Sequence, residues 1–254
     1  MNQIEKARAF SALHIKGNPL VLYNIWDAGG ARALAKAGAP AVATGSMSVA
    51  ASQGYKDGQD LPLDQVLIIA ERISTAVDVP VSIDFEGAYA VDPDGVAANV
   101  TRLIGTGAIG INFEDQVVGA KGLYPIEVQA ERIGAARAAA EAAGVPVHIN
   151  ARTDLFLKAP KGSDPSEFEA ESLERAAAYT QAGADSYFVP GLTDGDQIAR
   201  LCQSASLPVN VMAMGDQLGK VSDLAAMGVA RLSFGPAPYF AAMQALAQRY
   251  QDLS

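Results

Sequence analysis

The sequence contains few of the residues that build disulfide frameworks, zinc sites or nucleic-acid-binding surfaces. Among its 254 residues are one cysteine, Cys202, and two histidines. An intrachain disulfide and a cysteine-rich zinc site are therefore excluded. The net charge is −9 and no cluster of Lys and Arg stands out, which argues against nucleic-acid binding. No apolar run reaches membrane-spanning length, and the first residues lack the pattern of a signal peptide. We therefore expect a cytoplasmic protein without a membrane partner.

Eight short apolar runs alternate with segments of helical periodicity along the whole chain. The predicted strands are residues 20–25, 41–44, 79–84, 108–113, 145–150, 186–189, 207–211 and 230–234. Segments such as 63–77 and 128–143 have the apolar spacing of helices, and a short helix up to about residue 17 is expected on the outside. Alternation of this kind predicts a parallel sheet, and eight units predict a (β/α)8 TIM barrel forming a single domain over residues 1–254. A doubly wound open sheet is the alternative.

Carboxylates and an arginine follow the ends of three predicted strands. Asp84 and Glu86 end the third apolar run, Glu114 follows the fourth, and Arg152 follows the fifth. Residues two apart in a strand point to the same side, so Asp84 and Glu86 should converge at the mouth of the barrel. Crowded carboxylates require a cation or a proton between them, and an all-oxygen set suits Mg²⁺. An arginine facing this cation would bind a substrate carboxylate in a bidentate manner.

The same residues allow a purely structural interpretation. Acids and arginines at strand ends also pair with each other, and helix N-termini attract Asp in any barrel. The two histidines add little to either interpretation: His148 lies within an apolar strand and is expected in the core, and His14 is expected at the surface.

Seven short motifs along the chain resemble those of the isocitrate lyase/phosphoenolpyruvate mutase superfamily. They are Tyr-Asn-Ile-Trp-Asp-Ala (23–28), Thr-Gly-Ser (44–46), Gly-Tyr-Lys-Asp-Gly (54–58), Asp-Phe-Glu-Gly-Ala-Tyr (84–89), Gly-Ile-Asn-Phe-Glu-Asp (110–115), Ile-Asn-Ala-Arg-Thr-Asp (149–154) and Phe-Val-Pro-Gly (188–191). The resemblance covers residues 20–239. It implies a (β/α)8 barrel that forms homo-oligomers, a dimer or tetramer. It also implies Mg²⁺-dependent cleavage or formation of a C–C or P–C bond next to a 2-oxo or 2-hydroxy carboxylate.

The resemblance also implies roles for individual residues. Asp84 matches the main metal ligand, and three further acids match the residues that hold the metal or its waters. These acids are Asp57, Glu86 and Glu114, and Glu86 stands where many members have Asp. A second group matches the substrate site: Thr44, Gly45 and Ser46 receive the carboxylate and oxo groups, Arg152 clamps the carboxylate, and Asn210 lines the far side.

Departures from the superfamily pattern narrow the expected activity. The loop at 116–125 has neither the cysteine nor the histidine of the lyase branch, which argues against cleavage of isocitrate or 2-methylisocitrate. Gly191 stands where the lyases tend to have Glu. Lys121 and Tyr124 are the obvious proton-carrying groups of the shortened loop, and Lys121 is a candidate catalytic residue beside Arg152 and Asp57.

The resulting expectation is a Mg²⁺-dependent lyase that cleaves a C–C bond of a small, oxaloacetate-like acid through a metal-stabilised enolate. A P–C bond enzyme acting on phosphonopyruvate is one alternative. A barrel that binds a carboxylate without turnover is another.

Overall fold

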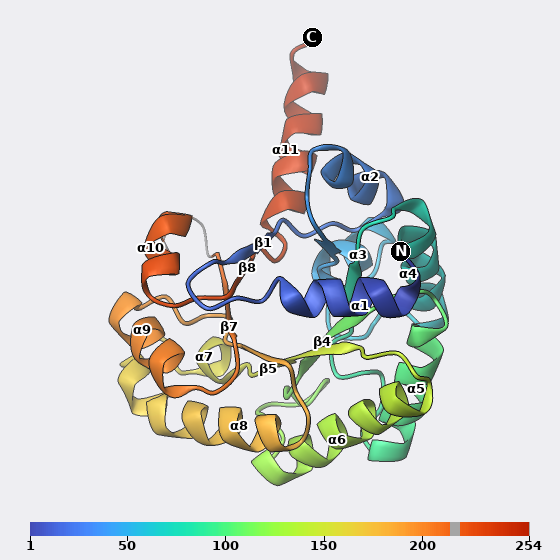
Figure 1. Ribbon diagram of the computed structural model, residues 1–254. Helices are drawn as coiled ribbons and strands as arrows, with labels where there is room; N and C mark the ends of the chain where they lie inside the picture. The colour runs from blue at the N-terminus through green and yellow to red at the C-terminus, as the bar shows by residue number, and fades with distance from the viewer. Residues whose placement is uncertain (214–218, 254) are drawn as a thin grey trace.

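The computed structural model describes residues 1–213 and 219–253 and contains a parallel eight-stranded barrel (Figure 1). The strands are β1 (Leu20–Leu22), β2 (Val42–Ala43), β3 (Val81–Asp84), β4 (Gly110–Glu114), β5 (His148–Arg152), β6 (Ser186–Phe188), β7 (Val209–Met212) and β8 (Arg231–Ser233). Parallel pairing runs continuously from β1 through β8, β7, β6, β5, β4 and β3 to β2. Between β1 and β2 the barrel closes through the Ile25 amide, which donates to the Ala43 carbonyl (2.9 Å), and the Gly45 amide, which donates to the Ile25 carbonyl (3.2 Å). The predicted (β/α)8 barrel is therefore confirmed.

Helices alternate with the strands, and most of them surround the barrel. They are α1 (Gln3–Ala12), α2 (Ala28–Lys36), α3 (Ser46–Ser52), α4 (Leu63–Ala76), α5 (Pro93–Ile104), α6 (Ile126–Ala142), α7 (Leu155–Lys158), the 3-10 helix η1 (Pro165–Phe168), α8 (Glu169–Gln181), α9 (Gly195–Ser204), α10 (Val221–Ala226) and α11 (Ala237–Gln251). None of the helices in the described part of the chain is both long enough and apolar enough to cross a membrane.

Two strands extend further toward the mouth than the apolar pattern predicts. Glu114 is the last residue of β4 and Arg152 is the last residue of β5, and the two are register partners. The predicted strands ended at Phe113 and Asn150. Backbone pairing continues past that point because a barrel interior can hold polar side chains at its mouth.

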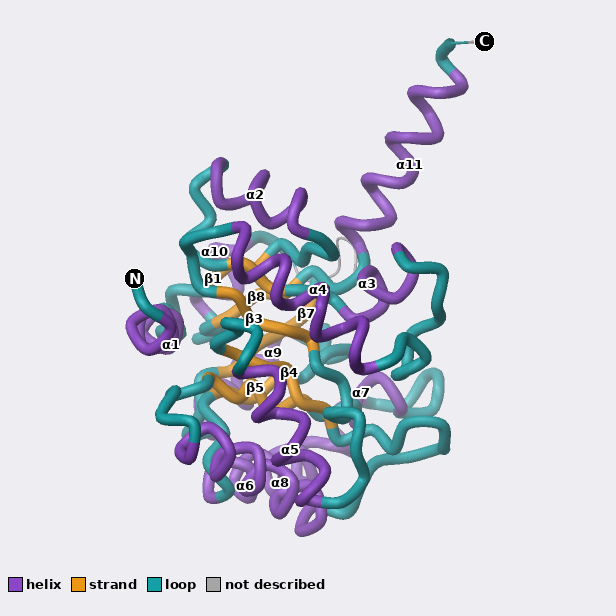
Figure 2. The backbone as a smooth tube through the Cα atoms, turned by 90° about the vertical axis from the view of Figure 1, so that its right-hand side faces the viewer, coloured by secondary structure: helices purple, strands orange, loops and turns teal. Residues whose placement is uncertain are grey.

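The N-terminal helix packs on the outside of the barrel, across one end of it. Figure 2 shows α1 at the end of the barrel opposite α3 and α7. Phe10 is fully buried there, with its ring 5.2 Å from that of His148 on β5. His14 is buried as well and stacks on His148 at 4.0 Å, so its predicted surface position is wrong. The apolar face of α1 thus closes the amino-terminal end of the barrel, and His148 is a core residue as predicted.

The last helix does not join the ring around the barrel. In Figures 1 and 2, α11 projects away from the body of the molecule. Its apolar side chains Phe240, Leu246 and Tyr250 are exposed, and so are Val21 and Tyr23 around β1. One chain therefore leaves an apolar helix and part of the outer barrel wall uncovered.

Candidate active site

A cleft of about 270 Å³ opens at the carboxyl ends of the strands. It is lined by Ser46, Asp57, Asp84 and Arg152 together with apolar residues that follow later strands. In a (β/α)8 barrel this is the end where active sites lie. With Gly45, which also lines the cleft, the structure therefore brings together five of the predicted site residues at the expected place.

Asp84 is the last residue of β3 and is held from two directions. The amide of Ser46 donates to Asp84 Oδ2 at 2.9 Å, and the Asp84 amide donates to Thr44 Oγ1 at 2.8 Å. Among the described residues, the other carboxylate oxygen, Oδ1, is buried and has no hydrogen-bond partner. A buried, unpaired carboxylate oxygen is costly. Its position beside the cleft marks the place where a cation would be most stabilising.

Glu86 lies in a turn after β3 and not in the strand itself. Its φ of +48° is in the left-handed region, as are those of Ala88 (+58°) and Tyr89 (+55°). Non-glycine residues rarely adopt this conformation, and such strain concentrates at functional sites. The expectation that strand alternation aligns Asp84 with Glu86 was therefore wrong, although both side chains line the same small cavity. The left-handed turn, rather than strand alternation, brings the side chain of Glu86 to the cavity that Asp84 also lines.

The buried Glu86 carboxylate accepts hydrogen bonds from the backbone amide of Gln59 (2.7 Å) and from the Tyr89 hydroxyl (3.3 Å). Burial raises the pKa of Glu86 to about 7, and the charges of Asp84 and Asp57 add to this rise. The pKa of Asp57, which lies at the rim of the cleft, is raised by burial and then by the charge of Asp84. The acids therefore repel one another, and a cation between them would relieve this repulsion.

The acid set fits a divalent cation that keeps most of its water. Among residues 1–213 and 219–253, no three His, Cys, Asp or Glu side chains converge closely enough to enclose an ion by themselves. Mg²⁺ usually binds through one or two carboxylates and retains several waters, so a cage of three direct ligands is not required. Asp84, with its free Oδ1, is positioned as the direct ligand. The charge of Asp84 contributes to the raised pKa values of Asp57, Glu86 and Glu114, so these three acids lie near enough to Asp84 to hold the waters of such an ion.

Arg152 ends β5 and faces the cleft between two carboxylates. Its Nε and Nη2 donate to Asp154 Oδ1 and Oδ2 at 2.6 and 3.0 Å, and its Nη1 lies 3.0 Å from Glu114 Oε2. These ion pairs raise the pKa of Arg152 against the effect of its burial. Burial raises the pKa of Glu114, and the ion pair with Arg152 opposes that rise. The guanidinium is thus permanently charged and fixed in orientation.

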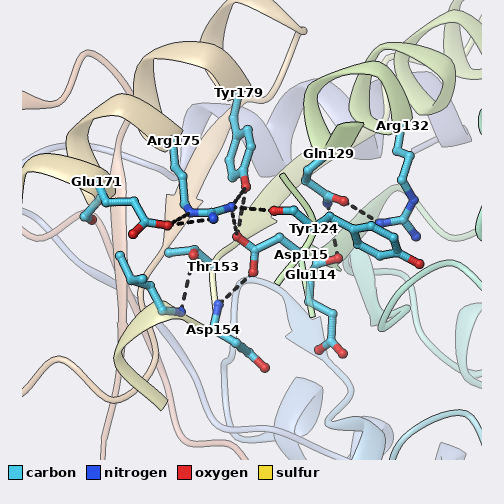
Figure 3. A network of polar contacts seen from close by, with 12 residues as sticks. Glu114, Asp115, Tyr124, Gln129, Arg132, Thr153, Asp154, Glu171, Arg175 and Tyr179 are labelled. Carbon is cyan, nitrogen blue, oxygen red and sulfur yellow. Dashed lines mark hydrogen bonds and ion pairs between the residues drawn. The ribbon is translucent and has the colours of Figure 1, made fainter. Parts of the chain in front are cut away.

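Behind these residues a buried ion pair fixes the ends of β4 and β5 (Figure 3). Asp115 Oδ1 accepts from the Asp154 amide at 3.0 Å. Its Oδ2 accepts from Arg175 Nη1 at 3.0 Å and from the Tyr179 hydroxyl at 2.8 Å. In Figure 3 the carboxylates of Glu114 and Asp154 point away from this cluster. Asp115 is therefore a structural residue that holds Asp154, and through it Arg152, in position.

The floor of the cleft is a layer of buried polar side chains. Arg231 of β8 is fully buried and donates to Asn112 Oδ1 at 3.1 Å, and Asn150 donates to the same oxygen at 2.8 Å. Burial lowers the pKa of Arg231 to about 9, and the charge of Asp84 opposes this fall. The barrel interior thus carries a positive charge directly below the acids.

The remaining predicted site residues occupy different places. Gly45 lines the cleft with Ser46, whereas Thr44 faces the adjoining small cavity and supports Asp84 through its hydroxyl. Asn210 is buried below the lining and bonds Ser233 at 3.2 Å. Lys121 is exposed on the loop after β4 and does not line the cleft. The roles of these residues stay predictions.

One residue of the site was missed from the sequence, and the role of a second, which lies at a predicted strand end, was not predicted. Asn24 lines the cleft and joins three strand ends: its amide donates to the Thr44 carbonyl, and its oxygen accepts from the amides of Phe234 and Gly235. Asp154 holds Arg152. Asn24 falls in the matched motif at 23–28, and Asp154 is two residues from Arg152. Both residues therefore lie in motifs that the sequence analysis names, but an asparagine or an aspartate at such a position does not by itself identify a role.

Comparison with known proteins agrees with this geometry. The model of the phosphoenolpyruvate phosphomutase family matches residues 10–254. A 2-methylisocitrate lyase of Escherichia coli is 32% identical over 209 residues, which are 80% of this chain and 68% of that protein. The chain belongs to the isocitrate lyase/phosphoenolpyruvate mutase superfamily.

Two further members of the superfamily match nearly the whole chain. An uncharacterized protein of Mycobacterium tuberculosis is 32% identical over 97% of this chain and 89% of its own length. A crystal structure from Burkholderia cenocepacia, named "a putative phosphonomutase", is 43% identical and superposes with a TM-score of 0.96 over the full length of both chains. Known relatives thus include both lyases and proteins named for phosphonate chemistry.

Proposed function

We propose that this protein is a Mg²⁺-dependent lyase that cleaves a C–C bond next to a 2-oxo or 2-hydroxy carboxylate. The observation that carries the proposal is the unpartnered, buried Oδ1 of Asp84 in a cleft that also presents Arg152. A cation site beside a fixed guanidinium suits an acid whose oxo and carboxylate oxygens are adjacent. Relatives of the chain include 2-methylisocitrate lyase and oxaloacetate decarboxylase, which act on such acids by name.

Each group has a separate task in this proposal. Mg²⁺, when bound, would act as a Lewis acid that stabilises the enolate left by bond cleavage. Asp84 would hold the ion, with Asp57, Glu86 and Glu114 as its outer support. Arg152, fixed by Asp154, would bind the substrate carboxylate.

The loop after β4 determines what kind of substrate we expect. It contains no cysteine or histidine, and Lys121 on it is exposed. A reaction in which solvent protonates the enolate does not depend on a group from this loop. Oxaloacetate is the simplest compound that meets this requirement.

A P–C bond enzyme is the second candidate, favoured by the similarity to the Burkholderia structure. Phosphonopyruvate would bring a carboxylate and a doubly ionisable phosphonate into the cleft, which is more negative charge than the two carboxylates of oxaloacetate. The described lining contains one cation, Arg152, against the two carboxylates of Asp57 and Asp84. This charge balance supports the C–C lyase over the P–C enzyme.

The test is a substrate screen of the purified protein with and without Mg²⁺. The panel contains oxaloacetate, 2,3-dimethylmalate, 2-methylisocitrate, isocitrate and phosphonopyruvate, with oxo-acid and phosphate release measured in parallel. We expect Mg²⁺-dependent oxo-acid formation without phosphate release, and its loss in Asp84→Asn. Phosphate release from phosphonopyruvate as the fastest reaction would replace the proposal by the P–C enzyme. Mg²⁺-dependent binding without any product would replace it by a carboxylate-binding barrel.

We also propose that the protein is a homo-oligomer in which α11 of one copy covers the exposed wall around Val21 and Tyr23 of another. The support is that one chain leaves both apolar surfaces uncovered, the helix and the wall. The cytoplasmic location stays a prediction from the sequence.

A further inference from the structure

The floor of the cleft holds the side-chain amide of Asn112 in a fixed orientation. Asn112 lies on β4, lines the cleft and is only 4% exposed. Its Oδ1 accepts hydrogen bonds from Arg231 Nη2 at 3.1 Å and from Asn150 Nδ2 at 2.8 Å. Because a guanidinium can only donate, the atom of Asn112 that faces Arg231 must be the oxygen. The amino group of Asn112 is therefore directed away from these two donors.

This amino group is available to a ligand. Among the described residues, Nδ2 of Asn112 has no hydrogen-bond partner, and the atom is not buried. The space that Asn112 lines is the cleft, so its N–H groups are accessible from there. The oxygen, by contrast, already accepts from two donors and has no lone pair left for a cation. Asn112 is thus a hydrogen-bond donor of the site and not a metal ligand.

The other neutral polar side chains of the described lining already have protein partners. Asn24 donates to one backbone carbonyl and accepts from two backbone amides. The Ser233 hydroxyl is shared with two buried side chains, and the Ser46 hydroxyl interacts with the carboxylate of Asp57. Asn112 is therefore the neutral side chain of this lining that offers a donor to a substrate.

Asn112 lies beside the proposed cation site and below Arg152. It is the register partner of Asp84 on β3 and of Asn150 on β5. Arg152 follows Asn150 by two residues on the same strand, which places its backbone about 7 Å closer to the mouth. A small acid in the cleft would therefore have Arg152 at its upper end, the cation site at Asp84 beside it, and the Asn112 donor below.

A neutral donor suits a carboxylate that is to leave the substrate. When the C3–C4 bond of oxaloacetate breaks, its electron pair passes into the enolate at C2 and C3, and C4 leaves as CO₂. Water then protonates C3 and gives pyruvate. Negative charge thus moves away from the C4 carboxylate, so a cation bound to that group would stabilise the reactant more than the transition state. A neutral amide orients the carboxylate with a weaker hydrogen bond than a cation forms.

We propose that Asn112 binds the substrate carboxylate that leaves as CO₂. This inference rests on the proposed function and names its substrate class, which is 2-oxo acids that carry a second carboxylate on C3. Arg152 and the cation site bind the end of the substrate that keeps the charge, and Asn112 binds the end that loses it.

The test compares each enantiomer of malate with the matching enantiomer of 2-hydroxybutanoate by titration calorimetry of the full chain with Mg²⁺ present. Both acids have four carbons and a 2-hydroxy carboxylate, and they differ in a terminal carboxylate or methyl group. Neither has the 2-oxo group that decarboxylation requires. We expect one enantiomer of malate to bind about tenfold more tightly than its methyl counterpart, because a hydrogen bond to a charged group is the stronger kind.

Two variants remove the donor in different ways. Asn112→Asp keeps an oxygen for Arg231 and Asn150 and places a carboxylate oxygen where the amino group was, so it should reverse the preference for malate. Asn112→Leu combined with Arg231→Met removes the donor without adding charge and should abolish the preference. In both variants we expect kcat/KM for oxaloacetate to fall about 10- to 100-fold. The matched control is Asn18→Asp, an exposed site outside the cleft, which should leave the preference and kcat/KM unchanged.

Oxalate separates the two proposals, because it needs the cation and Arg152 but has no group on C3 that could reach Asn112. Mg²⁺-dependent oxalate binding combined with equal or weaker binding of malate than of 2-hydroxybutanoate to the wild type would overturn the role of Asn112 alone. A malate preference that persists in both variants would do the same. Formation of glyoxylate from malate would show that the C2–C3 bond breaks, and would overturn CO₂ as the leaving group. Absence of Mg²⁺-dependent oxalate binding would instead overturn the proposed function.

Discussion

Arg152 depends on the shape of its side chain as well as on its charge. Its guanidinium binds both oxygens of Asp154 and one of Glu114. A lysine retains the charge but cannot form this fork. We therefore predict that Arg152→Lys lowers the affinity for oxalate in the presence of Mg²⁺ by about 10- to 100-fold, with an unchanged circular dichroism spectrum.

Arg102→Lys is the matched control for this substitution. Arg102 pairs with Asp64 on the surface, where the two side chains are 49% and 79% exposed, and the change should leave oxalate affinity unaltered. Equal affinity in Arg152→Lys and the wild type would mean that Arg152 does not bind the carboxylate.

Glu86 should make the stability of the metal-free protein depend on pH. Its folded-state pKa of about 7 is above the ordinary value of 4.5, so the folded state binds the proton more tightly than the unfolded chain does. Stability is then lost as pH rises from about 4.5 through 7, where the buried carboxylate must ionise. Relative to Glu86→Gln, the wild type in EDTA should lose about 2.5 kcal/mol of unfolding free energy between pH 5 and 8.

Urea unfolding of both proteins across this pH range measures the effect, and groups common to both cancel in the difference. Mg²⁺ should restore the wild type at pH 8, because it binds the ionised acids. A difference that stays constant with pH would show that Glu86 titrates normally in the folded protein.

At the scale of the elements, the ends of β4 and β5 and the helix α8 are joined by the ion pair of Asp115 and Arg175. Both side chains are buried, so removing the Asp115 charge leaves Arg175 with the partly exposed Glu171 as its remaining ionic partner, and removing Arg175 leaves the buried Asp115 without a cation. We predict that Asp115→Asn lowers the free energy of unfolding by about 3 kcal/mol. Combining it with Arg175→Met should cost less than the sum of the two single changes.

Chemical denaturation of the four proteins in this double-mutant cycle provides the measurement. Asp64→Asn, which removes an exposed ion pair, should cost less than about 1 kcal/mol. Strict additivity of the two buried substitutions would mean that the pair has no coupling energy.

The sequence predicts the features that depend on local patterns, and it does not predict those that depend on contacts between distant parts of the chain. Regular alternation of apolar runs predicts the barrel because each unit follows local periodicity. The gathering of the acids and Arg152 in one site is predictable because the carboxyl ends of parallel strands meet at the same end of the barrel. Glu86 reaches the site through a left-handed turn, which local patterns do not reveal. The core position of His14 depends on α1 closing a barrel that forms from distant strands.

At the scale of the whole molecule, the direction of α11 could not be predicted from its own sequence, because its apolar residues suit packing on either its own barrel or another copy. In the structure it projects from the body, and the proposed oligomer rests on this observation. We predict that replacing Phe240, Leu246 and Tyr250 by serine converts the wild-type oligomer to a monomer.

Light scattering coupled to size-exclusion chromatography gives the mass of each form. Gln244→Ser with Gln248→Ser on the same helix serves as the control and should keep the oligomer. A monomeric wild-type protein, or an oligomer that survives the triple change, would contradict the proposed assembly.

The central claim is that the site stabilises an enolate next to a carboxylate, and this is testable without knowing the substrate. The measurement is exchange of the C3 protons of pyruvate for deuterium in D₂O, followed by proton NMR with and without Mg²⁺. We predict exchange by the wild type that requires Mg²⁺ and falls to background in Asp84→Asn. Mg²⁺-dependent binding of pyruvate with no exchange above that of Asp84→Asn would contradict the claim.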